Sequence, residues 1–193
     1  DITHHIEPQN VFSAAFQLYT CYSYFPAGTI HVAVVDPGVG TSRQIICAKT
    51  RSYYFLAPDN GLLSCILNRE KDAVIRSVTN TDYFMRNTSN TFHGRDIFAS
   101  VAGYLAQGIP FTELGPLTSS PVLFSFSEPI RSENSVAGKI ISIDSFGNLI
   151  TNIRAADIDL EEGTEFRMSI GNRVISQFVR AYGDANQGDL LVT

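Results

Sequence analysis

The chain has 193 residues, 44% of them hydrophobic, which is enough apolar material for one large or two small folded domains rather than a disordered segment. Its formal net charge is −5 and it has no run of Lys or Arg, so a nucleic-acid partner is not expected, because phosphate-binding proteins carry a clustered basic face. We also expect neither a signal peptide nor a membrane span. Cys21, Cys47 and Cys65 lack metal-ligand or redox spacing, which indicates reduced thiols and a cytoplasmic location.

The first 107 residues alternate between helical and strand patterns. Apolar residues at helical spacing predict a helix over residues 8–24, and a nearly continuous β-branched run over 29–35 is typical of a strand covered on both faces of a parallel sheet. The other predicted elements are strands over 44–50, 53–57 and 73–78, a short helix from Gly61, and a longer helix over 95–107. This alternation predicts an α/β architecture, with a mostly parallel sheet flanked by helices.

A change in composition divides the chain. Residues 108–135 are rich in Pro, Ser, Thr and Glu without sustained periodicity, which is typical of a segment that crosses a surface. Short strand patterns follow over 138–143, 149–153, 165–170 and 174–179, separated by turn signals. We therefore predict an α/β domain at 1–125, a linker at 126–137 and a smaller β domain at 138–193.

The first candidate for a reactive group is Asp36, which directly follows the most apolar predicted strand. Open α/β sheets bind ligands outside the carboxyl ends of their strands, so this position suits a site. The turn at Pro37 and Gly38 leads on to Arg43 and can bring the two charged side chains face to face. From these residues alone, a turn-capping Asp beside an exposed Arg is the more common explanation.

A second candidate is His93, which precedes Gly94 at the start of a predicted helix, where a glycine leaves room for a ligand to approach closely. An isolated histidine is more often structural, and both interpretations stay open. The glycines of residues 36–40 do not predict a phosphate cradle, because a strand rather than a helix follows them. His4 and His5 are adjacent and point to opposite faces of any strand, so no metal site is expected.

Two asparagine-containing segments have a simpler explanation as turns. Residues 144–148 join two predicted strands, and Gly147 and Asn148 tolerate the positive φ of a hairpin turn. Asn60 precedes Gly61 and is expected to shape its own turn and nothing more.

Taken together, four segments resemble the SAM hydroxide adenosyltransferases, which are S-adenosyl-L-methionine hydrolases related to the fluorinase and chlorinase. The segments are DPGVG at 36–40 with Arg43, APDNGLL at 57–63, TFHGRD at 91–96, and DSFGN at 144–148 with Thr151 and Asn152. They follow the family's order and spacing, and the resemblance extends from Asp1 to Thr193. It implies an N-terminal α/β domain, a smaller C-terminal antiparallel β-barrel-like domain, and a homotrimer with sites at subunit interfaces.

The resemblance also implies roles for individual residues. The family's water-activating triad falls on Asp36, Arg43 and His93. Its substrate-binding positions fall on Phe92 and Gly94 near the reacting carbon, Asp144 at the methionine amino group, Asn148 at the adenine, and Tyr182 as an aromatic face. No metal and no cofactor are implied, since S-adenosyl-L-methionine is the substrate. Two further family segments, one holding the ribose and one holding the methionine carboxylate, are expected before Asp1 and after Thr193.

The implied reaction is hydrolysis of S-adenosyl-L-methionine to adenosine and L-methionine, by displacement at the 5′-carbon with water. Bulk water is a poor nucleophile, so an enzyme must place it in line and remove a proton. Asp36 and His93 can accept that proton, whereas Arg43 is always charged and can only orient the water and stabilise developing hydroxide. One alternative is a halogenase, in which halide replaces water; the retained triad disfavours it. The other is a non-catalytic protein that binds S-adenosylmethionine or adenosine.

Overall fold

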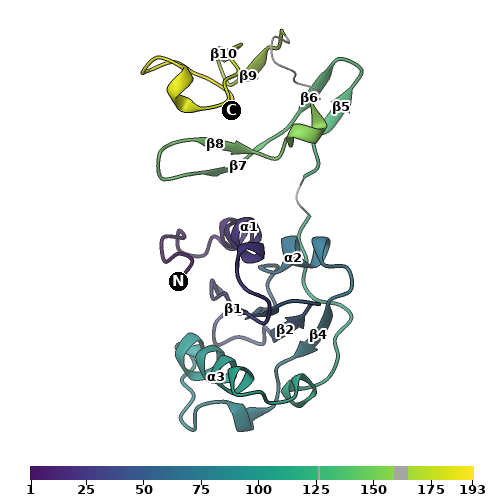
Figure 1. Ribbon diagram of the computed structural model, residues 1–193. Helices are drawn as coiled ribbons and strands as arrows, with labels where there is room; N and C mark the ends of the chain where they lie inside the picture. Colours follow the sequence, from purple (N-terminus) through teal and green to yellow (C-terminus); the bar gives the residue numbers. More distant parts are fainter. Residues whose placement is uncertain (126, 159–164) are drawn as a thin grey trace. The chain divides into compact units, whose positions relative to one another are not determined.

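The computed structural model describes residues 1–125, 127–158 and 165–193 (Figure 1). The chain divides into two compact units, Asp1–Phe126 and Ser127–Thr193. Each unit is described here by itself. Residue 126, the first residue of the predicted linker, lies outside the described residues.

Unit 1, Asp1–Phe126, is built on a four-stranded sheet with helices on both faces (Figure 1). Its strands are β1 (Ile30–Val32), β2 (Ile45–Lys49), β3 (Tyr54–Pro58) and β4 (Val74–Ser77), in the spatial order β1-β3-β2-β4. Its helices are α1 (Val11–Cys21), α2 (Ser64–Arg69), a π-helix (Gly94–Ala99) and α3 (Ser100–Ala106), with 3-10 turns at Tyr22–Tyr24, Thr81–Tyr83 and Phe111–Leu114. The α/β prediction is confirmed for this unit.

The sheet of unit 1 is mixed, so the prediction of a mostly parallel sheet is only partly right. β1 and β3 are parallel, whereas β2 is antiparallel to both of its neighbours, β3 and β4. The reason is the short connection over residues 50–53 between β2 and β3, because a parallel pair needs a crossover of about a dozen residues or more. β1 is an edge strand among the described residues, and Val32 is 43% exposed, so this strand is not covered on both faces.

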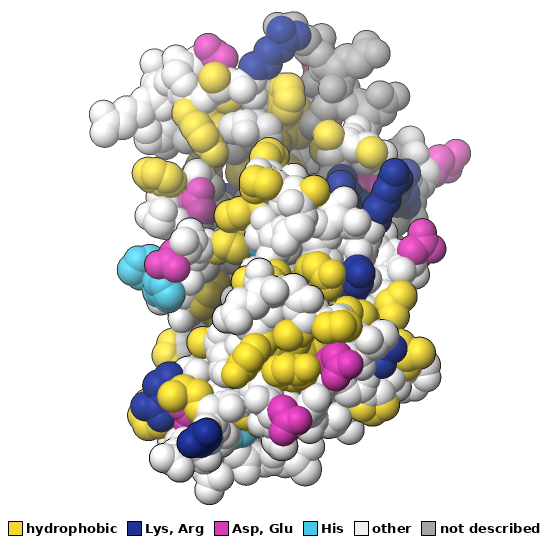
Figure 2. Space-filling model, turned by 60° about the horizontal axis from the view of Figure 1, so that its bottom comes forward, with side chains coloured by type: hydrophobic (Ala, Val, Ile, Leu, Met, Phe, Trp, Pro, Cys, Tyr) yellow, Lys and Arg dark blue, Asp and Glu magenta, His cyan; other side chains and the backbone are white. Residues whose placement is uncertain are grey.

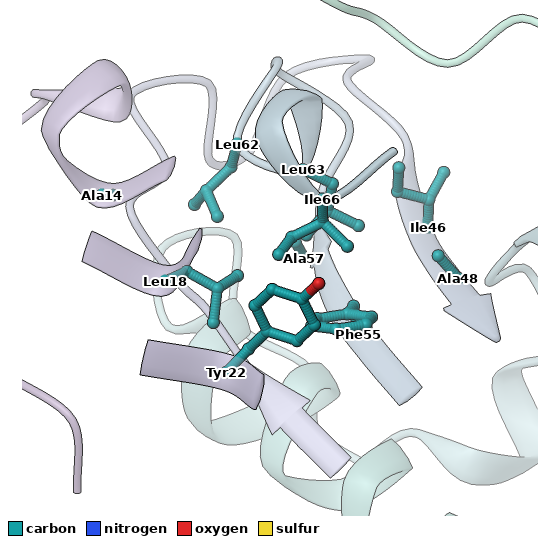
Figure 3. Packing of buried hydrophobic residues seen from close by; sticks show 10 residues of the cluster. All are labelled: Ala14, Leu18, Tyr22, Ile46, Ala48, Phe55, Ala57, Leu62, Leu63 and Ile66. Atoms are coloured by element: carbon teal, nitrogen blue, oxygen red, sulfur yellow. The ribbon is translucent and has the colours of Figure 1, made fainter. Parts of the chain in front are cut away.

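Alternate residues of β2 and β3 enter two separate cores on opposite faces of the sheet. The first core is shown in Figure 3 and joins the sheet to α1, the following 3-10 turn and α2; its buried members are Ala14, Leu18, Tyr22, Ile46, Ala48, Phe55, Ala57, Leu62, Leu63 and Ile66. The second core joins the sheet to the π-helix, α3 and the 3-10 turn near residue 114; its buried members are Ile45, Cys47, Leu56, Val78, Ile97, Phe98, Val101, Leu105 and Leu114. A sheet buried on both faces is a rigid support for the loops at its strand ends.

Helix α1 begins after Asn10, whose side chain accepts the backbone N–H of Ser13 at 2.9 Å and so caps the first turn. At the other end, the 3-10 turn buries Tyr22, which is 1% exposed. Its hydroxyl donates to Glu70 Oε1 at 2.7 Å, so the polar end of a core aromatic residue is satisfied. The helix predicted over residues 8–24 is therefore α1 followed by a tighter turn.

Unit 2, Ser127–Thr193, consists of three two-stranded antiparallel sheets. They are β5 (Ile130–Ser132) with β6 (Ser135–Ala137), β7 (Ile140–Ile143) with β8 (Leu149–Thr151), and β9 (Met168–Ile170) with β10 (Arg173–Ile175), accompanied by 3-10 turns at Ala155–Asp157 and Tyr182–Asp184. Residues 130–137, within the predicted linker, form the β5–β6 hairpin.

The β-barrel-like form expected for this part of the chain is not supported by the described residues. A closed barrel requires each strand to be hydrogen-bonded on both sides, whereas each pair here bonds only within itself. In the described part of unit 2, the buried hydrophobic residues are Ile175 and Val179 alone, so there is no large interior around which strands would close.

The three cysteines are free thiols, as expected. Burial raises the pKa of Cys47 and of Cys65 to about 12, so both are inert apolar side chains at neutral pH. In the part of the chain that the structure describes, no helix combines the length and apolar character that a bilayer span requires. On the face shown in Figure 2, Lys and Arg side chains are interspersed with Asp and Glu.

Candidate active site

The loop after β1 carries Asp36, and it is held in place from the neighbouring strand end. Asn60, which follows β3, donates from Nδ2 to the carbonyl of Val35 at 2.9 Å. Its Oδ1 accepts the backbone N–H of Leu62 at 3.2 Å. Asn60 therefore shapes its own turn, as expected, and also fixes the residue before Asp36, which the sequence did not reveal.

The same loop lies directly against the segment that leads to His93. Gly40 has a positive φ of 77°, and a Cβ atom there would lie 2.6 Å from the carbonyl oxygen of Asn90. Only glycine fits this close approach of two backbones. The loop is also closed on itself, since the Thr41 hydroxyl donates to the carbonyl of Gly38 at 2.6 Å. The two loops that carry Asp36 and His93 are thus packed together.

The structure brings Asp36, Arg43 and His93 together. Arg43 Nε donates to both carboxylate oxygens of Asp36, at 3.0 and 2.8 Å, and its Nη2 also donates to Asp36 Oδ2. The same Nη2 lies 2.7 Å from His93 Nδ1. The side chains of Arg43 and Asp36 are only 10% and 5% exposed, so the ion pair is well removed from solvent. Arg43 therefore sits between the carboxylate and the imidazole.

The contact with Arg43 determines the tautomer of His93. A guanidinium has donors and no acceptor, so Nδ1 of His93 must accept, and the proton of the neutral ring lies on Nε2. The imidazole thus offers an N–H donor on its other side. Arg43 also lies over the ring of Phe98, with its central carbon 5.8 Å from the ring centroid. Sequence reasoning missed Phe98, which looked like one more apolar residue on a helix face.

The π-helix after His93 is tied to the preceding loop by Asp96, a residue that is 0% exposed. Its carboxylate accepts the backbone N–H of Ser89 at 2.7 Å and the Nε of Arg95 at 2.5 Å. Arg95 in turn lies over the ring of Phe92, 5.1 Å from its centroid. The hydrogen bond from Arg95, followed by that from Ser89, lowers the pKa of Asp96. Sequence reasoning missed Asp96, although an acidic residue within an apolar helix was a usable signal.

The surroundings of the triad are partly open. Phe92 is 61% exposed, and a Cβ atom at Gly94 would meet Val34 at an ordinary contact distance of 3.7 Å. A hollow of about 460 Å³ lies at Arg43; its other lining residues are Thr41, Ser42, Gln44, Asp59, Thr118, Ser120 and Val122. Most of these residues are polar, so solvent can occupy this hollow.

Unit 2 places the remaining predicted residues in and around one turn. Asp144, directly after β7, accepts the backbone N–H groups of Phe146 and Asn148, at 2.8 and 2.9 Å, on Oδ1. Its Oδ2 accepts Nδ2 of Asn148 at 2.7 Å. A hollow of about 320 Å³ is lined by Phe146, Asn148 and Tyr182. Phe146 was missed by sequence reasoning, although an aromatic residue at the tip of a predicted hairpin was a signal for a binding surface.

Among the described residues, no group of three or more His, Cys, Asp or Glu side chains is arranged to hold a metal ion. The side chains that the structure brings together are a carboxylate, a guanidinium and an imidazole, with the guanidinium between the other two. Such a row can bind a water molecule, orient it and receive its proton.

Comparison with known proteins gives consistent matches along the chain. The model of the SAM hydroxide adenosyltransferase N-terminal domain matches residues 1–115, and that of the C-terminal domain matches residues 138–193. An (R)-S-adenosyl-L-methionine hydrolase of Salinispora tropica is 36% identical, covering 100% of this chain and 73% of the relative. A fluorinase of an Actinoplanes species is a more distant relative, 27% identical over 82% of this chain and 62% of its own. A crystal structure of an uncharacterized conserved protein from Thermotoga maritima has a TM-score of 0.90 and 38% identity, covering 99% of this chain and 74% of that one.

Proposed function

This chain belongs to the SAM hydroxide adenosyltransferase family, and we propose that it hydrolyses S-adenosyl-L-methionine to adenosine and L-methionine. The membership confirms the resemblance carried by the four sequence segments. The observation that supports the reaction within this chain is the contact of Arg43 with both Asp36 and His93, with the Asp36–Arg43 ion pair largely shielded from solvent.

In the proposed reaction, a water molecule attacks the 5′-carbon of the adenosyl group. The new C–O bond forms as the C–S bond breaks, and the sulfonium sulfur keeps the electron pair, so methionine leaves with a neutral thioether. One proton of the attacking water must then go to the protein. The carboxylate of Asp36 is the best placed acceptor, because Nδ1 of His93 is engaged by Arg43 and its Nε2 carries a proton. We assign His93 Nε2–H and Arg43 to orienting the water and stabilising the developing hydroxide.

The proposed substrate contacts follow the family positions. Phe92 and Gly94 would line the pocket near the reacting carbon, and Asp144 would hold the methionine amino group. Asn148 and Tyr182 would bind the adenine, and the exposed Phe146 is added to them because it lines the same hollow. A homotrimer and a cytoplasmic location are further proposals, which analytical ultracentrifugation and cell fractionation test.

Product analysis tests the proposed reaction. The protein is incubated with S-adenosyl-L-methionine and chloride in ¹⁸O-labelled water. The nucleosides are then separated, and their masses are measured by mass spectrometry. We expect adenosine with the label on its 5′-hydroxyl. Formation of 5′-chloroadenosine would indicate a halogenase, and unchanged ligand would indicate a non-catalytic binding protein; unlabelled adenosine would exclude water as the nucleophile.

Substitution of the triad tests the roles of its members. General-base catalysis contributes about 10²–10⁴-fold, so we expect Asp36→Asn to lower kcat by this factor, or roughly 3–5 kcal/mol of barrier. His93→Ala should also lower kcat, and the double variant should lose less than the product of the two factors, since the residues act as one unit. Asp72→Asn, which changes an exposed carboxylate in the same unit, is the control. Losses that multiply would argue against a joint role.

A further inference from the structure

The turn between β7 and β8 is organised around the carboxylate of Asp144. One oxygen, Oδ1, accepts the backbone N–H groups of Phe146 and Asn148 at 2.8 and 2.9 Å. These contacts, with the hydrogen bond from the Asn148 side chain as the largest effect, lower the pKa of Asp144. The carboxylate is therefore ionised at neutral pH and acts as an acceptor only.

The second oxygen of Asp144 fixes the orientation of a neighbouring amide. Oδ2 accepts Nδ2 of Asn148 at 2.7 Å. If this amide were turned over, its Oδ1 would face the carboxylate, and two acceptors would oppose each other. Because a carboxylate offers no proton, only one of the two amide orientations is allowed. Oδ1 of Asn148 is thus held on the side away from Asp144.

The same amide lines a hollow whose other walls are aromatic. The hollow has a volume of about 320 Å³ and is lined by Phe146, Asn148 and Tyr182. Phe146 and Tyr182 are 89% and 60% exposed, so their rings are free of protein cover over most of their surface. Aromatic faces beside a single amide suit a flat heterocycle that is recognised by hydrogen bonds at its rim.

We propose that Asp144 is a positioning residue for base specificity: by orienting the Asn148 amide, it makes this hollow accept a 6-aminopurine and disfavour a 6-oxopurine. The exocyclic amino group of the first donates to Asn148 Oδ1, whereas the oxo group of the second places an acceptor against that oxygen. This inference rests on the proposed function, because it assumes that the hollow holds the base of the substrate.

Adenosine and inosine provide the test, since they differ in this group and neither carries a methionine moiety that Asp144 could also bind. Binding of each nucleoside to the intact chain is measured by calorimetry. We expect adenosine to bind about tenfold more tightly than inosine, the value of one hydrogen bond. In Asp144→Asn the substituted side chain can donate as well as accept, so the Asn148 amide can turn over and the preference should fall to roughly twofold or less.

Two further variants separate positioning from folding. Ser145→Ala changes the same turn without touching the Asp144–Asn148 contact and should keep the preference. Asn148→Ala keeps the backbone contacts of Asp144 and should lose the preference even if Asp144→Asn fails to fold, as monitored by circular dichroism. Equal affinities in the unmodified protein, no binding of either nucleoside, or an unchanged preference in Asp144→Asn or Asn148→Ala would overturn the inference.

Turnover of S-adenosyl-L-methionine, measured in parallel, keeps this inference apart from the proposed function. Turnover without a preference for adenosine leaves the hydrolase proposal in place and removes the role of Asp144. A preference for adenosine that depends on Asp144, without any turnover, supports base recognition by this hollow and counts against hydrolysis.

Discussion

In unit 1 the proposed triad lies on loops at the end of a sheet that is buried on both faces. In unit 2, by contrast, the proposed base-binding side chains lie on an exposed hairpin turn and on a 3-10 turn. The carboxylate and guanidinium of the triad are 5% and 10% exposed, but Phe146 is 89% exposed. The difference follows from the tasks proposed for them. Activating water requires charged groups held still and away from solvent, while an aromatic ring contributes binding free energy when a ligand covers it.

The largest effect on stability that tests this contrast is expected from substituting one phenylalanine in each unit. Phe98 is fully buried beneath Arg43, so Phe98→Ala should lower the free energy of unfolding by about 3–5 kcal/mol. Phe146→Ala should change it by no more than about 0.5 kcal/mol. It should instead weaken adenosine binding roughly tenfold, because a stacking surface is lost. Urea denaturation measures the change in the free energy of unfolding, and calorimetric titration measures the change in adenosine affinity. A large loss of stability in Phe146→Ala would contradict the contrast between the two units.

A smaller effect is expected at Gly40, where the two triad loops meet. Gly40→Ala places a Cβ atom 2.6 Å from the Asn90 carbonyl, in addition to the strain of a positive φ. Gly28 has a similar φ of 89° with nothing within 4 Å of its Cβ position, so Gly28→Ala is a matched control. Both variants should lose about 1–2 kcal/mol of stability from backbone strain, and Gly40→Ala should lose more than Gly28→Ala because of the added clash.

Only Gly40→Ala should also lose catalysis, on the order of 10²-fold in kcat, because it displaces Asp36 relative to His93. Steady-state kinetics with S-adenosyl-L-methionine on the two folded variants measures this. Equal activity losses in Gly40→Ala and Gly28→Ala would show that the contact between the loops is not what positions the triad.

The smallest effect concerns a buried group that the proposed mechanism does not use. His31 is 4% exposed among aromatic rings, stacked on Phe55 at 5.0 Å, and its Nε2 has no hydrogen-bond partner among the described residues. Burial lowers its pKa. In the unfolded chain the His31 imidazole takes up its proton at about pH 6.5, and in the folded chain it does so only at a lower pH. The stability of unit 1 should therefore fall as the pH drops below about 6.5.

Replacing the imidazole tests this pH dependence. His31→Phe fills the same aromatic site without a titrating group, so the melting temperature should decline less between about pH 7 and pH 5. His5→Gln, at an exposed position, is the control and should keep the decline of the unmodified chain. A decline in His31→Phe as steep as in the unmodified chain would assign the pH dependence to other groups.

Much of unit 1 could be predicted because its signals are local. The helical spacing before residue 24 and the short, largely apolar strand patterns predicted α1, β1, β2 and β3 close to their observed places. Strand direction could not be taken from those patterns, since it depends on the connection over residues 50–53. In unit 2 the patterns predicted β7, β8, β9 and β10, but β5 and β6 were missed because they lie in the segment predicted as a linker. The association of the strands into separate pairs was also not predicted, because short alternating patterns carry no information on which strands meet.

For the candidate site, the sequence by itself predicted Asp36, Arg43 and His93 through the resemblance of their segments, in order and spacing, to those of the family. Only the tertiary structure decided that Arg43 lies between the other two and that the His93 proton is on Nε2. It also showed that Asp144 accepts the side-chain amide of Asn148 and that Asp96, Phe98 and Phe146 lie around the candidate sites. These facts depend on distances between side chains that come from separate segments or face one another across a turn, and no one-dimensional pattern specifies such distances.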